Sequence, residues 1–231
     1  MVIYLNILLN KKMKKLNNKI TNCKKCPRLV HFREKIASEK RKQYQNEIYW
    51  GKPVPGFGDE KAEILILGLA PAAHGGNRTG RPFTGDKSAE FLFKCLFNSN
   101  LANQPYSRHI GDGLKLKNIY ITVALKCVPP FDKPNSDELK SCFNFLKNEL
   151  DYLRNIKTIL TLGKIAFEAC IKFFQIKRTD AKFIHGEEYV TATNQRIVAC
   201  YHPSPRNVNT KRINEKGMVD LLTKIHDLHR K

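Results

Sequence analysis

The chain has 231 residues, of which 42% are hydrophobic. This length fits one domain with a full core, and no apolar run is long enough to span a membrane. The 41 Lys and Arg against 21 Asp and Glu give a formal net charge of +20, which favours a polyanionic partner, most simply nucleic acid. Ribosomal and membrane-surface proteins are also basic, so charge alone does not identify the partner.

The amino end, MVIYLNILLNKK, is not typical of a secretion signal. Its apolar stretch has no basic residue before it and no small-residue cleavage site after it. Met13 begins a segment, MKKLNNKITNCKKCPRL, that resembles a native start. We therefore expect residues 1–18 to be a disordered or mis-started extension outside the fold, and residues 19–231 to form a single domain.

Short aliphatic and β-branched runs predict four strands, at residues 64–67, 119–124, 158–162 and 197–201. Helical patterns occupy the intervals, at residues 28–41, 88–97, 136–153, 164–174 and 214–229. This alternation predicts an α/β fold, a three-layer sandwich with a central, mostly parallel, four-stranded sheet.

Each predicted strand ends in an unusual sequence. The first runs into GLAPAAHGGNRTGRPFTGD, residues 68–86, and the last into YHPSPRNVNT, residues 201–210. In an open α/β sheet, ligands bind just outside the carboxyl ends of the strands. One edge of the sheet is therefore predicted to carry the site, the alternative being that these are ordinary surface loops.

Seven cysteines without a secretion signal indicate a reducing compartment rather than disulfides. Cys23 and Cys26 form a C-x2-C pair, Cys127 follows a strand, and Cys142 lies in a helix. Four thiolates hold either zinc or an iron–sulfur cluster, and spacing does not choose between them. The alternative is that only the first pair is chemically linked. The other three cysteines are expected to be buried apolar residues: Cys95, Cys170 and Cys200.

The motifs at 68–86 and 201–210 together resemble those of the family 5 (type b) uracil-DNA glycosylases, and the resemblance runs from about Cys23 to the final helix. It implies a DNA repair hydrolase that cleaves the N-glycosidic bond of uracil, and of other deaminated bases such as hypoxanthine, leaving an abasic site. The implied partner is double-stranded DNA carrying deaminated bases, with single-stranded DNA as a second form of substrate. A monomer in the bacterial or archaeal cytoplasm, without a membrane partner, is expected.

The resemblance also implies a cofactor. Enzymes of families 4 and 5 carry a [4Fe–4S] cluster on four cysteines in this layout, which assigns the cluster to Cys23, Cys26, Cys127 and Cys142. Its expected role is structural, tying the amino-terminal segment to the sheet.

Two residues are expected to be catalytic. Asp86 ends the first motif and is the candidate that orients water and stabilises positive charge on the sugar. Its alternative role is to cap the helix that follows, and the two roles are compatible because a carboxylate at a helix start tends to stay ionised. His202 is expected to donate toward the departing base, as its counterpart does in the superfamily.

The base-binding residues are expected to come from three segments. Backbone N–H groups around Ala70, Pro71 and Ala72 would face the leaving base, and Phe83 would stack on it or belong to the core. Val123 stands where family 4 has an Asn that reads uracil. A small apolar residue there is usual in family 5 and implies a wider choice of bases, because an apolar site discriminates less than a hydrogen-bonding one.

Polar and basic residues near these loops are expected to grip phosphates, with a solvated face as the alternative. They are Arg78, Arg81, Arg206, Asn207, Lys211 and Arg212. The chain departs from relatives at Asp132, where many have Asn, and an Asp cannot donate the amide hydrogen bonds of Asn.

Two other functions fit parts of the sequence. One is a catalytically silent, cluster-bearing DNA-binding module, against which the presence of Asp86 and His202 argues. The other is a family 4 enzyme strict for uracil, against which Val123 and the Leu-Ala-Pro-Ala run at 69–72 argue.

Overall fold

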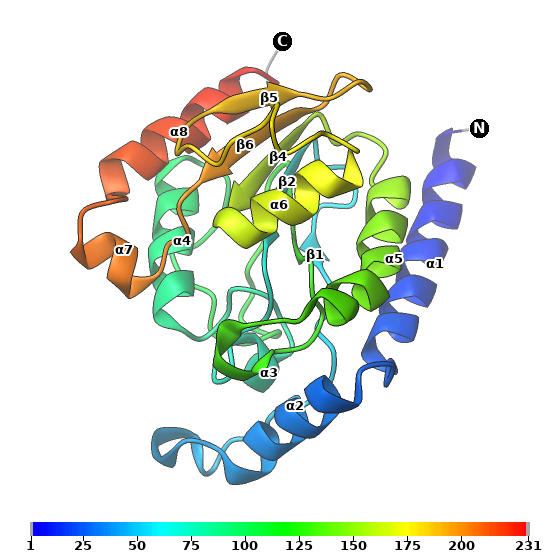
Figure 1. Ribbon diagram of the computed structural model, residues 1–231, viewed down its shortest axis with the longest axis vertical. Helices are drawn as coiled ribbons and strands as arrows, with labels where there is room; N and C mark the ends of the chain where they lie inside the picture. Colours follow the sequence, from blue (N-terminus) through cyan, green and yellow to red (C-terminus); the bar gives the residue numbers. More distant parts are fainter. Residues whose placement is uncertain (1, 230–231) are drawn as a thin grey trace.

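The computed structural model describes residues 2–229, with only the backbone described for residues 2–10. Its centre is one sheet with the strand order β1-β3-β2-β4-β6-β5 (Figure 1). The strands are β1 Phe57–Gly58, β2 Ile64–Gly68, β3 Ile119–Val123, β4 Thr158–Leu162, β5 Glu188–Val190 and β6 Arg196–Cys200.

The four predicted strands form the parallel centre of this sheet, and the predicted α/β class is confirmed. All residues of β2, β3 and β4 are buried, as expected for parallel strands covered on both faces. The sheet nevertheless has six strands rather than four. The strands that sequence patterns missed, β1 and β5, pair antiparallel at the two edges and have only two and three residues, too few to show a periodicity.

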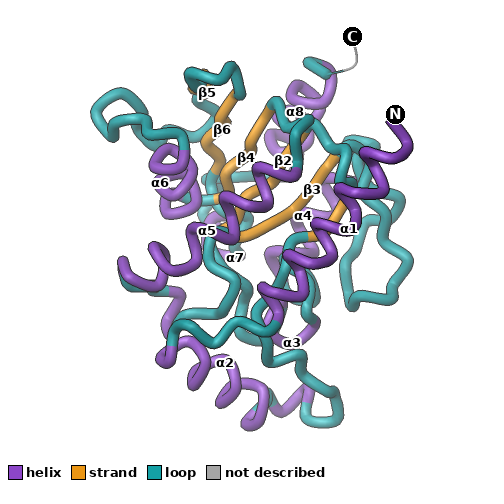
Figure 2. Tube along the Cα trace, turned by 90° about the vertical axis from the view of Figure 1, so that its right-hand side faces the viewer, coloured by secondary structure: helices purple, strands orange, loops and turns teal. Residues whose placement is uncertain are grey.

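Helices cover both faces of the sheet. They are α1 Val2–Thr21, α2 Pro27–Glu39, α3 Gly76–Thr79, α4 Lys87–Asn98, α5 Ser136–Tyr152, α6 Lys164–Phe173, α7 Pro205–Asn209 and α8 Glu215–Asp227. Side chains of α4 and α8 share one apolar core with the sheet, and those of α1, α5 and α6 share the other. Figure 2 shows α1 and α5 running side by side over the sheet, with α2 and α3 below its lower edge. None of the described helices combines the length and apolar character needed to cross a lipid bilayer.

The amino-terminal extension is part of the fold. Met13, Leu16 and Ile20 lie on one side of α1 and are buried in the core that α5 and the sheet share. The prediction that residues 1–18 lie outside the fold is therefore wrong for this helix, whose apolar residues recur at helical spacing. Residue 1, at the start of the predicted extension, and residues 230–231, at the end of the predicted domain, lie outside the described residues.

A buried ion pair joins the sheet to α5. Lys126 Nζ lies 2.6 Å from Glu149 Oε2, and the two side chains are 1% and 0% exposed. The same carboxylate accepts hydrogen bonds from Thr122 Oγ1 at 2.9 Å and from the backbone N of Gly56 at 3.3 Å. Such a pair is tolerated in the core because every charged atom has a partner, and removing one member leaves an uncompensated charge.

We expect Glu149→Leu to lower the free energy of unfolding by about 3–5 kcal/mol, because it leaves the Lys126 ammonium buried without its anion. Adding Lys126→Met should recover most of the loss. The measurement is urea denaturation. Asp151→Ala is the matched control, since it breaks the exposed pair with Lys147 on the same helix and should cost about 0.5 kcal/mol or less. Equal losses in Glu149→Leu and the control would contradict the prediction.

Candidate functional site

The site lies where the parallel strands end. In Figure 1 the chain leaves β2 toward α3 and leaves β6 toward α7, at the same edge of the sheet. The loop after β3 starts beside the loop after β2, because the backbone N of Ala124 donates to Gly68 O at 3.0 Å and that of Leu125 donates to Leu69 O at 2.8 Å. The predicted common edge is therefore present.

Asp86 is held at the first turn of α4. Its Oδ1 accepts a hydrogen bond from the backbone N of Ala89 at 2.9 Å, so the helix-cap role is confirmed. Its other oxygen lies against Gly75, where an added Cβ atom would stand 2.1 Å from Oδ2. The carboxylate position therefore requires glycine at residue 75.

Burial raises the pKa of Asp86 above its ordinary value, and the backbone N–H groups of Ala89 and Ser88 oppose the rise. The upward direction is the opposite of what a helix start alone predicts, because loss of water around the carboxylate outweighs the capping hydrogen bonds. Asp86 also lines a cavity of about 620 Å³, together with residues of the segments 44–48, 78–85 and 106–109.

Phe83, Val123 and His202 come together at the end of β2. Gly68 is paired with Val123, and a Cβ atom on Gly68 would stand 2.7 Å from the Phe83 ring and 3.3 Å from Val123 Cγ1. The rings of Phe83 and His202 are 5.9 Å apart between centroids. Phe83 is 8% exposed and has a left-handed backbone, with φ of 48°. It thus belongs to the core and also faces the His202 ring.

The loop that carries His202 is braced from within. Asn207 Nδ2 donates to the His202 carbonyl at 2.8 Å, and so does the backbone N of Ser204 at 2.8 Å. Burial lowers the pKa of His202 below its ordinary value of 6.5, and the charge of Asp132 opposes the change. The imidazole is therefore neutral near pH 7, with one ring N–H available as a donor.

The loop at 70–72 lies between two groups of predicted residues. Pro71 is buried, and Ala70 and Ala72 are half-buried. Ala70 packs on one side against the buried cluster that contains Cys142, while Ala72 accepts hydrogen bonds through its carbonyl from the loop that leads to Asp86. The cysteine group and the Asp86 loop are thus neighbours.

Two of the arginines predicted to contact phosphates are instead buried, at 8% exposure for Arg78 and 6% for Arg81. Arg78 pairs with Glu47 and donates to the carbonyls of His74 and Gly85. Arg81 contacts Asp112 at 2.6 Å. The prediction for these two residues is wrong, because their guanidinium groups are used to brace the loop.

The residues after β6 that were predicted to contact phosphates differ in their exposure. Arg206, Lys211 and Arg212 are exposed, in agreement with their predicted place on a basic surface. Asn207 is half-buried and its amide is occupied by the His202 carbonyl. Asn207 therefore supports the catalytic candidate instead of presenting its amide to DNA.

The four predicted cysteine ligands line one small cavity between the start of α2, the segment after β3, and α5. All are free thiols. Burial raises the pKa of Cys127 to about 12 and that of Cys142 to about 11, so these thiols ionise only if a cation replaces their protons. The backbone N of Lys126 donates to Cys142 Sγ at 3.2 Å.

Among the described residues, no group of three or more Cys, His, Asp or Glu side chains is arranged to hold a single metal ion. Tetrahedral zinc requires four thiolates that converge on one point. In an iron–sulfur cluster each iron of a four-iron core binds its own cysteine.

Arg33 is a buried cation that acts on one of the cysteines. It follows Leu29 by one turn on the buried side of α2 and is 2% exposed. Its Nη2 pairs with Glu34 at 3.4 Å, while its Nε and Nη1 have no hydrogen-bond partner. Its charge counteracts the rise in the pKa of Cys127. Leaving two nitrogens of a buried guanidinium unsatisfied is costly. Sequence reasoning missed Arg33, although its spacing from Leu29 places both on one helix face.

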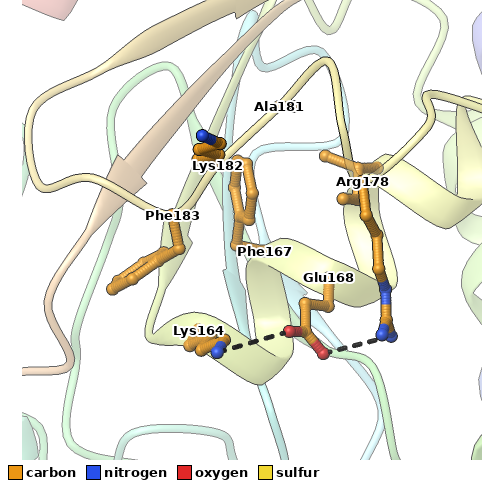
Figure 3. Close-up of a pocket in the computed structure, with 8 residues that line it drawn as sticks. Lys164, Phe167, Glu168, Arg178, Ala181, Lys182 and Phe183 are labelled. Atoms are coloured by element: carbon orange, nitrogen blue, oxygen red, sulfur yellow. Dashed lines mark hydrogen bonds and ion pairs between the residues drawn. The ribbon is translucent and has the colours of Figure 1, made fainter.

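A second cavity, of about 440 Å³, lies between α6 and the segment 178–183 (Figure 3). Its one carboxylate, Glu168, is paired with Lys164 at 3.9 Å and with Arg178 at 3.3 Å. The residues lining it include none of those predicted for the site. A carboxylate flanked by two cations is not placed for acid–base chemistry, so this cavity is not the site.

Comparison with known proteins gives the family. The family model described as the uracil DNA glycosylase superfamily matches residues 55–225. The chain is 45% identical over 205 residues to a type-5 uracil-DNA glycosylase from Pyrobaculum aerophilum, covering 89% of this chain and 88% of that protein. It is 42% identical to a type-5 enzyme from Thermus thermophilus, covering 88% and 92%. A type-4 enzyme from Archaeoglobus fulgidus is 30% identical, covering 65% and 70%.

Proposed function

The chain belongs to the uracil-DNA glycosylase superfamily and to its type-5 enzymes, and from this we propose that it removes uracil from DNA by hydrolysing the N-glycosidic bond. The observation that carries the proposal is the common edge of the sheet, where the loop after β2 carries both Asp86 and Phe83 and the Phe83 ring faces that of His202 from the loop after β6. The proposed activity is a step of DNA repair, since its product is an abasic site.

The reaction places opposite charges on its two fragments. Positive charge builds on the deoxyribose and negative charge on the departing base, so a site must stabilise both and supply water. The Asp86 carboxylate would stabilise the sugar and orient the water. His202, neutral because burial lowers its pKa, would donate its ring N–H to the base, and Phe83 would stack on it.

The Asp86 carboxylate also sets the expected pH dependence. Because its pKa is raised by burial, the ionised form is lost at a higher pH than for an ordinary aspartate. Because burial lowers the pKa of His202, its imidazole becomes neutral at a lower pH than an ordinary histidine does. Both reactive forms are therefore favoured as the pH increases toward neutrality.

The proposed substrate is DNA whose target nucleotide is extruded from the stack. Extrusion costs a few kcal/mol and is least costly for a mismatched base. The exposed cations after β6, Arg206, Lys211 and Arg212, would contact the flanking phosphates, which supply affinity without sequence information.

A wider choice of base follows from Val123. This buried valine is paired with Gly68 beside the Phe83 ring and offers no hydrogen bond to a base edge. Because an apolar wall does not reject analogues that lack a particular donor or acceptor, we propose hypoxanthine as a second substrate.

We also propose a [4Fe–4S] cluster bound by Cys23, Cys26, Cys127 and Cys142. Support comes from their shared cavity and from the buried Arg33 cation, which acts on Cys127 and has two nitrogens without a hydrogen-bond partner. When bound, the cluster would supply a covalent tie between the start of α2 and the end of β3. Cys142, together with Leu29 and Leu125, holds the loop at Ala70 in place through direct packing.

Asp86→Asn tests catalysis separately from binding. The amide keeps the size and much of the capping ability but not the charge, so we expect duplex affinity to persist while cleavage falls by about two orders of magnitude or more. The measurement is single-turnover cleavage of a uracil duplex, with binding by anisotropy, over a range of pH. The part of the acid limb that comes from Asp86 should be absent from the variant, while the part that comes from His202 should remain.

Asp151→Asn is the control for Asp86→Asn, since this exposed carboxylate on α5 pairs with Lys147 and is not among the residues that line the Asp86 cavity. It should leave the rate unchanged. Equal cleavage by wild type and Asp86→Asn would show that Asp86 is only a cap, and binding without cleavage in the wild type would favour the silent DNA-binding module.

The cluster is tested by metal content. Anaerobically purified protein should be brown and hold about four iron atoms per chain. Cys142→Ser should lose both colour and iron, because one ligand is removed. Cys95→Ala is the control, since Cys95 is buried in the other core, near α8, and should retain both. One zinc and no iron in the wild type would overturn the cluster.

Val123→Asn tests the choice of base. An amide at this position would hydrogen-bond uracil selectively, so the ratio of uracil to hypoxanthine cleavage should rise by about tenfold or more. The measurement is the ratio of single-turnover rates on matched duplexes. Val123→Ala is the control because it enlarges the space beside Phe83 without adding a hydrogen-bond donor. An unchanged ratio in Val123→Asn would mean that this position does not contact the base.

A further inference from the structure

One large apolar side chain stands out on the surface near the site. Phe131, in the loop between β3 and α5, is 91% exposed. Its backbone is left-handed, with φ of 55°, and so is that of the next residue, Asp132, with φ of 56°. A bulky residue in this region is unusual and is retained only where the surrounding structure enforces it.

The loop is rigid on both sides of Phe131. Pro129 and Pro130 precede it and Pro134 follows it, which removes backbone freedom. The carbonyl of Lys133 accepts a hydrogen bond from Arg28 Nη2 at 3.1 Å. A capping box between Asn135 and Glu138 then begins α5. Phe131 is therefore presented to solvent by a fixed support.

The position of the loop relates it to the site. It starts beside the loop after β2, at the edge that carries Asp86. The charge of the neighbouring Asp132 acts on His202. Phe131 thus stands at the same edge of the sheet as the group formed by Phe83 and His202.

We propose that Phe131 inserts into the DNA stack and fills the space vacated by the extruded nucleotide. A rigid, exposed aromatic ring suits this role, because proteins that open a duplex insert apolar side chains between base steps and bases stack readily on aromatic rings. The net charge of +20 brings DNA to the protein. This inference rests on the proposed function, since it concerns the opening of the same substrate.

The experiment compares Phe131→Ala with wild type on three uracil substrates. On a duplex with uracil opposite adenine, the single-turnover rate should fall by about 5- to 150-fold, the factor expected for losing one base–aromatic stack. The loss should be smaller for uracil opposite guanine, which is easier to extrude. On single-stranded DNA the rate should stay within about twofold, because no stack must be opened.

A binding measurement complements the rates. In the Asp86→Asn background, 2-aminopurine placed next to the uracil should brighten on binding, and Phe131→Ala should reduce this change. Phe131→Trp should retain both the rate and the fluorescence change. Phe97→Ala is the control, since Phe97 is an exposed phenylalanine at the far end of α4 and should behave as wild type.

The outcomes separate the two proposals. Equal rates for Phe131→Ala and wild type on the adenine duplex would overturn the role of Phe131 while leaving the proposed function intact. An equal loss on single-stranded DNA would also overturn it, because Phe131 would then act on the extruded base. Absence of cleavage by wild type on all three substrates would overturn the proposed function itself.

Discussion

Parallel pairing of four buried strands is the constraint on which the site depends. Because β3, β2, β4 and β6 run in one direction, their carboxyl ends meet at one edge, and loops far apart in the chain become neighbours. Asp86 and His202, 116 residues apart by number (202 − 86), share this edge for that reason. The hydrogen bonds that extend β3 past Val123 keep the cysteine-bearing loop beside the same place.

Buried charges hold these loops in fixed positions. Arg78 and Arg81, in the loop after β2, pair with Glu47 before β1 and with Asp112 between α4 and β3, and Lys126, after β3, pairs with Glu149 of α5. Each of these cations has a partner, so its burial is compensated. Arg33 differs because its Nη2 pairs with Glu34 while its other two guanidinium nitrogens have no hydrogen-bond partner.

Burial also prepares the two catalytic candidates in opposite ways. Loss of water raises the pKa of Asp86 and lowers that of His202, because in each case the charged form is disfavoured. For Asp86 the rise in pKa is opposed by the capping N–H groups, which stabilise the ionised carboxylate but do not fully offset its loss of water. For His202 it yields a neutral donor. In the proposed cleavage, Asp86 would be the negative group toward the sugar and His202 the uncharged donor toward the base.

The sequence by itself determined the features that depend on local patterns. Strand and helix periodicity gave the parallel centre, turn residues marked the loops at 68–86 and 201–210, and Asp86 was identified both as a cap and as a catalytic candidate. Only the tertiary structure decided which polar residues are occupied and which are exposed. Arg78, Arg81 and Asn207 were predicted to contact DNA but have partners within the protein, α1 joined the core, and Phe131 was left in solvent. Most of these outcomes depend on contacts between segments far apart in the chain. The residues next to a side chain in the sequence do not reveal which distant groups it will contact.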